Sequence, residues 1–419
     1  MNAIRFSTAL REHVRETIEG LGHADIVVGI PSYHSGSSLA HVIQTVAAGL
    51  ETHYRDAKAL IMISDGGSTD DSREIARRTE ISSFNIEKIV AIYRGVPGKG
   101  SGLRAVFEAA HFLKANAVAV FDSDLVSITP QWVKNMLDPV LGDYDLVAPY
   151  YRRYKLDGTI TNTIAYNLIR ALYGLRLRQP IGGDFGISRQ LVKHYLDQDV
   201  WETDVAKFGI DIYMTTSAIV HGFSICQTRL GLKVHGQKDP AADLGPMFRQ
   251  VMGTTFTLMD AYDGFWRGVQ GSKDLPILGE DVIQEPTPFN IDLEGLVEYF
   301  RIGFGNFEGI WQHILEEEDF NRIKALARVK EPDDFHLPIE SWVRTVYRYA
   351  AAYQVTPRQR MKVLDTMTPL YYARVASLIN ELNDKNPEEA ENHFEASARI
   401  FEHMKDYLLA IWKKEAQGA

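Results

Sequence analysis

Two carboxylates separated by a single residue, Asp122 and Asp124, end an apolar run that reads AVAVFDSD. On an extended chain, side chains two residues apart point to the same face, so both carboxylates could reach one site. Oxygen ligands of this kind suit Mg²⁺ or Mn²⁺, which also bind the phosphates of substrates. Solvated aspartates at the end of a strand are the alternative, and an isolated D-x-D motif does not separate the two interpretations.

Two glycine-containing turns place further polar groups after apolar runs. Residues 65–70 read DGGSTD, in which the glycines permit a tight turn and Asp65 could accept hydrogen bonds from a nucleobase. Residues 94–100 read RGVPGKG, in which exposed N–H groups and the Lys99 ammonium favour an anion. The alternatives are an N-capped turn and a flexible basic turn. The second segment is not a Walker loop, because Gly100 follows the lysine.

A histidine supplies a third kind of ligand. His235 lies in LGLKVHGQK, directly after a strand-like run over 225–234. An imidazole close to the carboxylate pair could complete the ligand set of a metal, and the nearby Lys233 could contact phosphates. A surface or packed histidine is the bland alternative.

These segments need a scaffold that brings them together. The first half of the chain alternates short apolar runs with amphipathic segments, which predicts an α/β fold with a mostly parallel sheet covered on both faces. Ligands bind beyond the carboxyl ends of the strands of such sheets, which is where each polar segment lies. The predicted strands are 25–33, 59–65, 88–94, 117–124 and 144–151, and the predicted helices are 37–50, 70–79 and 102–114.

The second half of the chain has a different character. Strand signals end near residue 239, and amphipathic stretches follow. We therefore predict an α/β domain over 1–239 and an α-helical domain over 240–419, which completes an acceptor site, mediates oligomerisation, or does both. The helical stretches are 247–262, 294–300, 338–353, 357–382 and 390–412.

Composition limits the classes of function. The net charge of −10 over 419 residues argues against a nucleic-acid-binding protein, which needs a basic surface. No run approaches the roughly 20 apolar residues of a membrane span. The single cysteine, Cys226, excludes an intrachain disulfide and favours a reducing cytoplasm. A homodimer is predicted because the helical half offers broad apolar faces and because homodimers are the commonest assembly.

Taken together, the segments resemble the GT-A glycosyltransferases, and more narrowly the retaining enzymes that make mannosylglycerate, glucosylglycerate and glucosyl-3-phosphoglycerate. The resemblance covers about residues 25–240 and implies a Rossmann-like, nucleotide-sugar-binding catalytic domain. A helical C-terminal domain is similar to that of mannosylglycerate synthases. The matching segments, in the family's order, are IPSYH, SDGGSTD, YRGVPGKGSGL, FDSDL, RQPIGGDFGISR, FGIDIYM and LGLKVHG.

The resemblance also implies a role for each matching residue. It places Mg²⁺ or Mn²⁺ on Asp124 and His235. The implied catalytic residues are Asp122, Asp124, Asp211 and Gln179. The implied donor-binding residues are Pro31, Tyr33, Asp65, Lys99, Asp122, Ser123, Gly182, Gly183 and Asp211. The implied acceptor-binding residues are Arg153, Gly158, Thr159, Thr161 and Ile181.

The expected reaction is therefore the transfer of glucose or mannose, with retention, from a GDP- or UDP-hexose to D-glycerate. Relatives that use 3-phosphoglycerate have a G-R-V-T-like acceptor loop, whereas residues 158–161 here read GTIT. The missing guanidinium removes a phosphate contact, although Lys155 or Arg152 could supply the charge. The alternatives are a glucosyl-3-phosphoglycerate synthase, an inverting transferase with another acceptor, a nucleotidyltransferase and a non-catalytic binding module. The sequence does not decide among GDP-, UDP- and ADP-linked donors, or between glucose and mannose.

Overall fold

The computed structural model describes residues 5–234, 240–282 and 284–418 and divides into two compact units. What we call the sheet unit comprises Met1–Arg153, Arg178–Gln237 and Leu275–Pro286. The helical unit comprises Tyr154–Leu177, Lys238–Asp274 and Thr287–Ala419. The chain thus passes from one unit to the other several times, and residues 154–177, which precede 239, belong to the helical unit.

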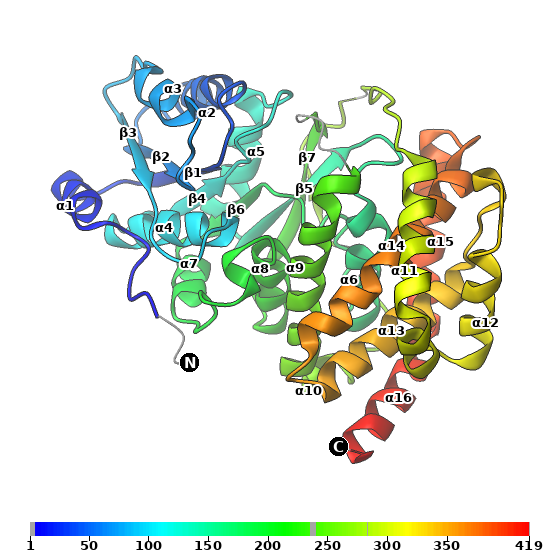
Figure 1. The fold of residues 1–419 in the computed structure, drawn as a ribbon. Coiled ribbons are helices and arrows are strands. Elements are labelled where there is room, and N and C mark those ends of the chain that lie inside the picture. The colour runs from blue at the N-terminus through cyan, green and yellow to red at the C-terminus, as the bar shows by residue number, and fades with distance from the viewer. Residues whose placement is uncertain (1–4, 235–239, 283, 419) are drawn as a thin grey trace. The chain divides into compact units, whose positions relative to one another are not determined.

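The sheet unit contains one eight-stranded sheet in the order β3-β2-β1-β4-β6-β5-β7-β8 (Figure 1). Strand β6 runs antiparallel to both of its neighbours, and the other pairings are parallel. The mixed, mostly parallel sheet predicted from the sequence is therefore confirmed. The strands are β1 Ile26–Ser32, β2 Ala59–Asp65, β3 Ile86–Ile92, β4 Ala117–Val120, β5 Leu146–Arg152, β6 Phe185–Ser188, β7 Ile225–Leu232 and β8 Ile277–Leu278.

Helices cover both faces of this sheet, which explains why its central strands are apolar along their whole length. Every residue of β2 is buried, for example. Figure 1 shows α2 and α5 on one side of the sheet and α4 and α7 on the other. The helices of the unit are α1 Glu12–Leu21, α2 Leu39–His53, α3 Ser72–Arg78, α4 Lys99–Phe112, α5 Pro130–Leu141, α7 Arg189–Leu196, the 3₁₀ turn η2 Asp204–Ala206 and α8 Ile210–Val220.

The fourth strand is shorter than the run 117–124 predicted. The last ladder hydrogen bond in this direction joins Phe121 N–H to the Gly29 carbonyl, and the Asp122 N–H then donates to the Asp184 carboxylate. A side chain thus replaces the neighbouring strand, and the chain turns. The expectation that Asp122 and Asp124 lie on an extended strand was wrong: both follow the end of β4, and Asp124 lies in a turn.

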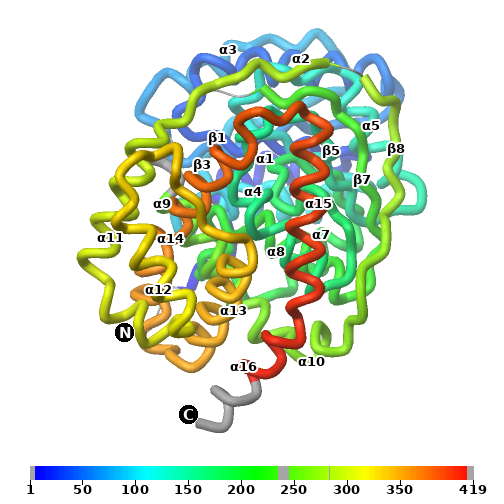
Figure 2. Tube along the Cα trace, turned by 90° about the vertical axis from the view of Figure 1, so that its right-hand side faces the viewer, coloured from blue at the N-terminus to red at the C-terminus, as the bar shows by residue number. Residues whose placement is uncertain are grey.

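The helical unit buries several aromatic side chains, among them Trp342, Tyr347 and Tyr371. The predicted helix over 390–412 is two helices, α15 and α16, which meet at Met404 (Figure 2). Within the described residues, no helix is long and apolar enough to cross a membrane. The unit contains the π-helix η1 Thr161–Ala165, α6 Tyr166–Tyr173, α9 Pro240–Ala261, α10 Asp263–Trp266, α11 Leu293–Ile314, α12 Glu317–Leu326, the 3₁₀ turn η3 Pro332–Asp334, α13 Ile339–Val355, α14 Arg360–Leu382, α15 Pro387–His403 and α16 Lys405–Gly418.

Candidate active site

Polar segments from several strands meet at one edge of the sheet. Strands β1, β2, β4, β5 and β7 all end there because they are parallel, and the antiparallel β6 begins there. This edge therefore collects the turn after β4, the residues after β5 and β7, and the residues before β6. The predicted arrangement of polar segments at the carboxyl ends of the strands is the arrangement that the fold produces.

Asp122 lies between two lysines. Lys99 Nζ is 2.9 Å from its Oδ1 atom, and Lys233 Nζ is 3.0 Å from its Oδ2 atom. The Lys233 side chain is buried and that of Lys99 is largely so, and burial alone would lower the pKa of each ammonium. The neighbouring carboxylates outweigh that effect and raise both pKa values above the ordinary value, so both lysines are charged.

Lys99 also joins Asp122 to Asp211, the predicted ligand of donor-sugar hydroxyls. Lys99 Nζ lies 3.2 and 3.3 Å from the two oxygens of Asp211, which is the second residue of α8. Burial raises the pKa of the Asp211 carboxyl, and the Lys99 charge opposes that shift. Lys99 therefore contacts both Asp122 and Asp211, and the donor-binding roles of the three residues stay predictions.

Asp184 is fully buried beneath the same carboxylates, with an exposed fraction of 0%. Its Oδ1 atom accepts the Asp122 N–H at 2.7 Å, and its Oδ2 atom accepts from Lys233 Nζ at 3.0 Å and from the Tyr151 hydroxyl. Burial raises the pKa of the Asp184 carboxyl, against the lowering effect of Lys233. The Tyr151 hydroxyl has a pKa well above its usual range, because it is buried and faces this carboxylate. It therefore stays protonated and donates.

A change of register in the sheet aims Lys233 at this cluster. Tyr150 pairs with Arg229, but Tyr151 pairs with Gly231, so that Leu230 is an extra residue in β7. Side chains alternate between the two faces of a strand, so one extra residue moves every later side chain to the other face. Lys233, two residues after Gly231, thereby shares a face with Tyr151, and its Nζ lies 4.9 Å from the Tyr151 ring centre.

The segment 179–183 packs against the same lysines. The carbonyl of Gly182 accepts from Lys233 at 2.9 Å, and that of Gly183 accepts from Lys99 at 3.1 Å. Gly183 has φ +92°, and a Cβ atom on it would lie 2.1 Å from Asp122 Oδ2. Gln179 is buried and donates to the Tyr151 carbonyl at 3.0 Å. At position 183 only glycine fits, because the positive φ and the close approach of the Asp122 carboxylate both exclude a side chain.

The predicted nucleobase residues lie at the carboxyl ends of β1 and β2. Tyr33 is 63% exposed and stacks on His34 with ring centres 4.1 Å apart. Asp65 is fully buried, and its oxygens accept hydrogen bonds of 2.6 to 2.8 Å from Gly67 N–H, Ser68 N–H and the Ser68 hydroxyl. Pro31, in β1, is half-buried. Asp65 thus shapes its own turn, and a contact between Asp65 and a base stays a prediction.

The glycine-rich segment ahead of α4 differs from the expected set of exposed N–H groups. Gly98 N–H donates to the Tyr93 hydroxyl at 2.9 Å, and Gly100 N–H donates to the Lys207 carbonyl at 3.2 Å. A Cβ atom on Gly100 would lie 1.9 Å from the Val205 carbonyl oxygen. These glycines serve close packing against the segment around η2, and Lys99 is the group that reaches the carboxylates.

The predicted metal ligands are Asp124 and His235. Asp124 lies in the turn after β4, whereas His235 lies outside the described residues. The Val234 carbonyl accepts the Val126 N–H, and the Val234 N–H donates to the Ser127 hydroxyl, both at 2.9 Å. The residue before His235 is thus bound to the loop that follows Asp124. The part of the chain that the structure covers contains no group of three or more His, Cys, Asp or Glu residues suited to a metal.

Ser123, the middle residue of the D-S-D segment, is held by the loop after β1. Its hydroxyl is 2.7 Å from that of Ser35, and its carbonyl accepts from the Ser38 hydroxyl at 2.8 Å. These two hydrogen bonds fix the turn relative to β1. A hydrogen bond between Ser123 and a donor stays a prediction.

The predicted acceptor residues fall into both units. In the sheet unit, Arg153 lies over the Tyr151 ring at 5.2 Å, and Ile181 is half-buried in the segment 179–183. In the helical unit, Gly158 adopts φ +66°, and the Thr159 hydroxyl is 2.6 Å from that of Tyr371. Thr161 begins the π-helix η1, an irregularity that often marks functional sites. A role in acceptor binding stays a prediction for all five predicted residues.

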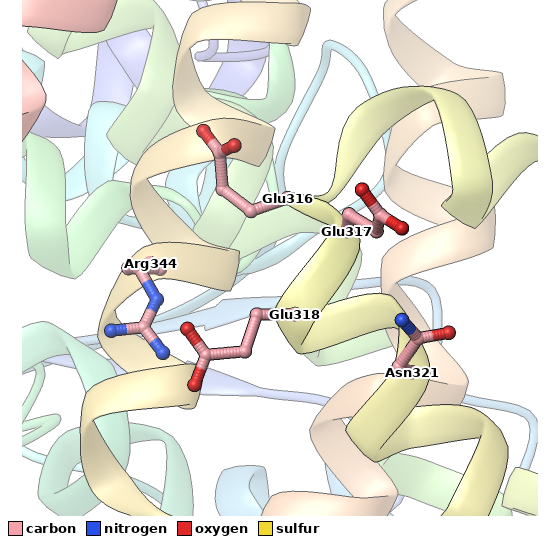
Figure 3. A pocket seen from close by; sticks show the side chains of 5 residues that line it. All are labelled: Glu316, Glu317, Glu318, Asn321 and Arg344. Atoms are coloured by element: carbon pink, nitrogen blue, oxygen red, sulfur yellow. The ribbon is translucent and has the colours of Figure 1, made fainter.

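A hollow in the helical unit lies at α12 and α13 and is lined by acidic side chains. Figure 3 shows Glu316, Glu317 and Glu318 with Asn321 and Arg344 around it. Arg344 donates to both oxygens of Asp319 at 2.6 and 2.7 Å. This guanidinium joins two helices, and the hollow contains none of the predicted site residues.

The sequence alone did not reveal the partners of Asp122. Lys233 was considered only as a phosphate contact, and nothing singled out Tyr151. The available signal was a lysine directly after an apolar strand in a parallel sheet, because such a position faces the edge at which ligands bind. Which carboxylate this lysine would contact depends on the register shift in β7, which the sequence pattern does not show.

Comparison with known proteins was made by sequence and by structure. Residues 37–253, just over half of the chain, match the family described as mannosylglycerate synthase, GT domain. A glucosyl-3-phosphoglycerate synthase of Mycolicibacterium smegmatis is 24% identical over 242 residues, which are 55% of this chain and 76% of that protein. A mannosylglycerate synthase of Selaginella moellendorffii is 26% identical over 200 residues, and one of Rhodothermus marinus is 27% identical over 136 residues.

The two mannosylglycerate synthase alignments are shorter. The Selaginella alignment covers 44% of this chain and 46% of that protein, and the Rhodothermus alignment covers 31% of this chain and 34% of that protein. Among solved structures, glucosyl-3-phosphoglycerate synthase from Mycobacterium tuberculosis, in complex with Mn²⁺, UDP-glucose and phosphoglyceric acid, is 23% identical, with a TM-score of 0.44. That match covers 61% of this chain and 85% of the mycobacterial one.

Proposed function

Because the chain belongs to the mannosylglycerate synthase glycosyltransferase family, we propose that it moves a hexose from a nucleoside-diphosphate sugar to D-glycerate with retention of configuration. The product is glucosylglycerate or mannosylglycerate, and the donor is a GDP- or UDP-hexose. The observation that carries the proposal is the contact of Lys99 with both Asp122 and Asp211 at the carboxyl ends of the strands. This contact unites three segments whose order in the chain resembles that of the family.

We assign the divalent cation, Mg²⁺ or Mn²⁺, to Asp124 and His235. The hydrogen bonds of Val234 to Val126 and Ser127 support this assignment, because they bring the chain next to the Asp124 turn immediately before the histidine. A carboxylate oxygen and an imidazole nitrogen, together with donor phosphates, form a suitable ligand set. When bound, such a cation neutralises the negative charge that grows on a departing diphosphate.

The protein's own groups position the donor. Asp211 accepts hydrogen bonds from sugar hydroxyls while Lys99 holds its orientation. The Gln179 Oε1 atom is buried and has no hydrogen-bond partner among the described residues, so it is an acceptor for a hydroxyl group. The acceptor hydroxyl attacks from the face that the diphosphate leaves, and a departing phosphate oxygen takes its proton. The proposal needs no protein base.

Two cations that could recognise a phosphorylated acceptor are otherwise engaged. Arg152 donates to Asp281 through Nε and Nη2 at 3.2 and 2.9 Å. Lys155, in the helical unit, donates to three carbonyls at the end of α14, those of Leu382, Asn383 and Lys385. Together with the absent arginine in the segment 158–161, these contacts support D-glycerate over 3-phosphoglycerate.

The test is a matrix of assays in which GDP-, UDP- and ADP-linked glucose and mannose are each offered with D-glycerate and 3-phosphoglycerate. We expect nucleoside diphosphate release with glycerate, and an axial anomeric linkage, as in the donor, by NMR of the product. Strict preference for 3-phosphoglycerate would overturn the acceptor assignment. A product whose anomeric carbon has the opposite configuration to the donor would overturn retention. Release of pyrophosphate would instead favour a nucleotidyltransferase. A cytoplasmic location and a homodimer stay predictions.

A further inference from the structure

The buried Asp184 carboxylate contacts three separate strand ends. Its donors are the Asp122 N–H after β4, the Lys233 ammonium after β7 and the Tyr151 hydroxyl within β5. It is completely buried, and each of its oxygens already accepts at least one hydrogen bond. A group in this position cannot approach a substrate, so Asp184 is not a catalytic base.

Asp184 also decides where β4 ends. Phe121 N–H still bonds to the carbonyl of Gly29 in β1, but the next N–H, that of Asp122, is taken by Asp184 at 2.7 Å. The chain leaves the sheet at this hydrogen bond, which sets the backbone of the D-S-D turn. The position of Asp122, and of Asp124 two residues later, therefore depends on the Asp184 carboxylate.

The same carboxylate balances charge around Asp122. Lys233 lies 3.0 Å from both Asp122 and Asp184, and Lys99 lies between Asp122 and Asp211. Two ammonium groups and three carboxylates thus form one network, in which Asp184, Asp211 and Lys233 are buried and Asp122 and Lys99 are partly buried. Removal of one charge from such a network leaves its neighbours without compensation in a medium that solvates them poorly.

We propose that Asp184 is a positioning residue for the transfer reaction, one that fixes the Asp122 backbone and the Lys233 ammonium without touching the substrate. Tyr151 acts through it, because the Tyr151 hydroxyl donates to the same Oδ2 atom as Lys233. The inference deepens the proposed function and rests on it. It assigns a mechanistic role to two residues that neither bind the metal nor contact the sugar.

The decisive variant is Asp184→Asn, which keeps the size of the side chain and one acceptor oxygen. The new amide nitrogen can only donate, so it cannot accept from either Lys233 or the Asp122 N–H, both of which donate to the Asp184 carboxylate. The matched control is Asp145→Asn. Asp145 is also buried and accepts from Ser188, Gln190 and Ser224, but it lies at the opposite edge of the sheet, just before β5.

Three measurements separate positioning from a merely structural role. These are kcat and the donor KM, the Mn²⁺ concentration for half-maximal activity, and the Mn²⁺-dependent Kd for UDP and GDP by calorimetry, each beside a thermal midpoint. We expect Asp184→Asn to lower kcat and to weaken Mn²⁺-dependent binding by about 10- to 100-fold. Losses of about this size are typical when a residue that orients the ligand-binding residues is removed. Asp145→Asn should lower only the thermal midpoint.

Tyr151→Phe supplies a second route if Asp184→Asn does not fold, because it removes one donor to Asp184 and should lower kcat by a smaller factor. Where Asp184→Asn does fold, Tyr151→Phe should have no additional effect in that background. Equal kcat and equal nucleotide binding in wild type and Asp184→Asn overturn the positioning role, as do losses no larger than those of Asp145→Asn. If the wild-type protein folds and binds Mn²⁺ and nucleotide but transfers no hexose, the proposed function fails. The difference in nucleotide binding between wild type and Asp184→Asn then decides whether Asp184 is a positioning residue. A wild-type chain that binds neither overturns both.

Discussion

The ammonium of Lys233 lies 3.0 Å from Asp122 Oδ2, opposite Lys99, which occupies the Oδ1 side of the same carboxylate. Asp122 is therefore compensated from two directions by lysines that come from distant parts of the sequence. An aspartate in this setting is well suited to hold an ordered position.

Replacement of Lys233 by Met should strongly destabilise the sheet unit, because the fully buried Asp184 and the partly buried Asp122 would lose a shared cation. Breaking a buried ion pair on one side costs about 3–5 kcal/mol, which corresponds to a fall in the thermal midpoint on the order of 10 °C. The control is Lys193→Met, which breaks an exposed pair with Asp197 and should shift the midpoint very little. Equal midpoints for the two variants would contradict the role given to Lys233.

Replacement of Gly183 by Ala should displace Asp122. The added Cβ atom would meet Asp122 Oδ2 at 2.1 Å, and the positive φ adds backbone strain of about 1–2 kcal/mol. We expect kcat to fall by about 100-fold, because displacements near 1 Å at a reacting centre have effects of that size. Gly222→Ala has the same sign of φ but open space around the new atom, so it should retain kcat. Comparable activity of the two variants would refute the close-approach argument.

Removal of divalent cations should abolish turnover. We expect exhaustive treatment with a chelator to stop hexose transfer, and Mn²⁺ or Mg²⁺ to restore it, because the departing diphosphate needs charge compensation. Asp124→Asn should raise the Mn²⁺ concentration for half-maximal activity, whereas Asp197→Asn, at an exposed position, should not. Full turnover of the metal-free enzyme would remove the basis for the assignment of Asp124 and His235.

The helical unit should lose stability in acid through Glu381. Burial disfavours the Glu381 carboxylate, but His393 and Arg374 lower its pKa from 4.5 to about 2. The folded state therefore binds fewer protons than the unfolded state between these two values. The stabilisation, of about 3 kcal/mol, is complete above pH 4.5 and is lost as the pH falls through 2.

Urea unfolding of wild type and Glu381→Gln between pH 7 and pH 2.5 checks this prediction. The difference in the free energy of unfolding should be largest at neutral pH and should shrink below pH 4.5. Curves that stay parallel over the whole range would show that Glu381 does not carry this pH dependence.

The long, apolar elements were predictable, and the short or side-chain-determined ones were not. The strand predicted over 59–65 coincides with β2, because the run ALIMISD is buried at every position. Strand β6 was missed because four residues, Phe185–Ser188, give no distinct periodicity. The end of β4 was misplaced because a distant carboxylate, Asp184, replaces a strand partner, and no local pattern records such a contact.

The sequence selected several residues that lie together at this edge of the sheet, but it did not predict the contacts among them. The resemblance indicated Asp122, Lys99 and Asp211, which the structure brings into contact. The roles of Lys233 and Tyr151 depend on tertiary pairing across strands that are far apart in the sequence. Such partners follow from register, and register in β7 changes within the strand itself.

The extra residue Leu230 in β7 means that the site depends on the number of residues in this strand as well as on their side chains. Exchange of one side chain for another between Arg229 and Leu232 leaves the alternation of the strand intact. Deletion of a single codon in the same stretch would carry Lys233 to the far face of the sheet, away from both aspartates. For protein engineering, a change of length in this stretch is therefore more disruptive than a substitution at a position other than Gly231, whose φ of +73° disfavours a side chain.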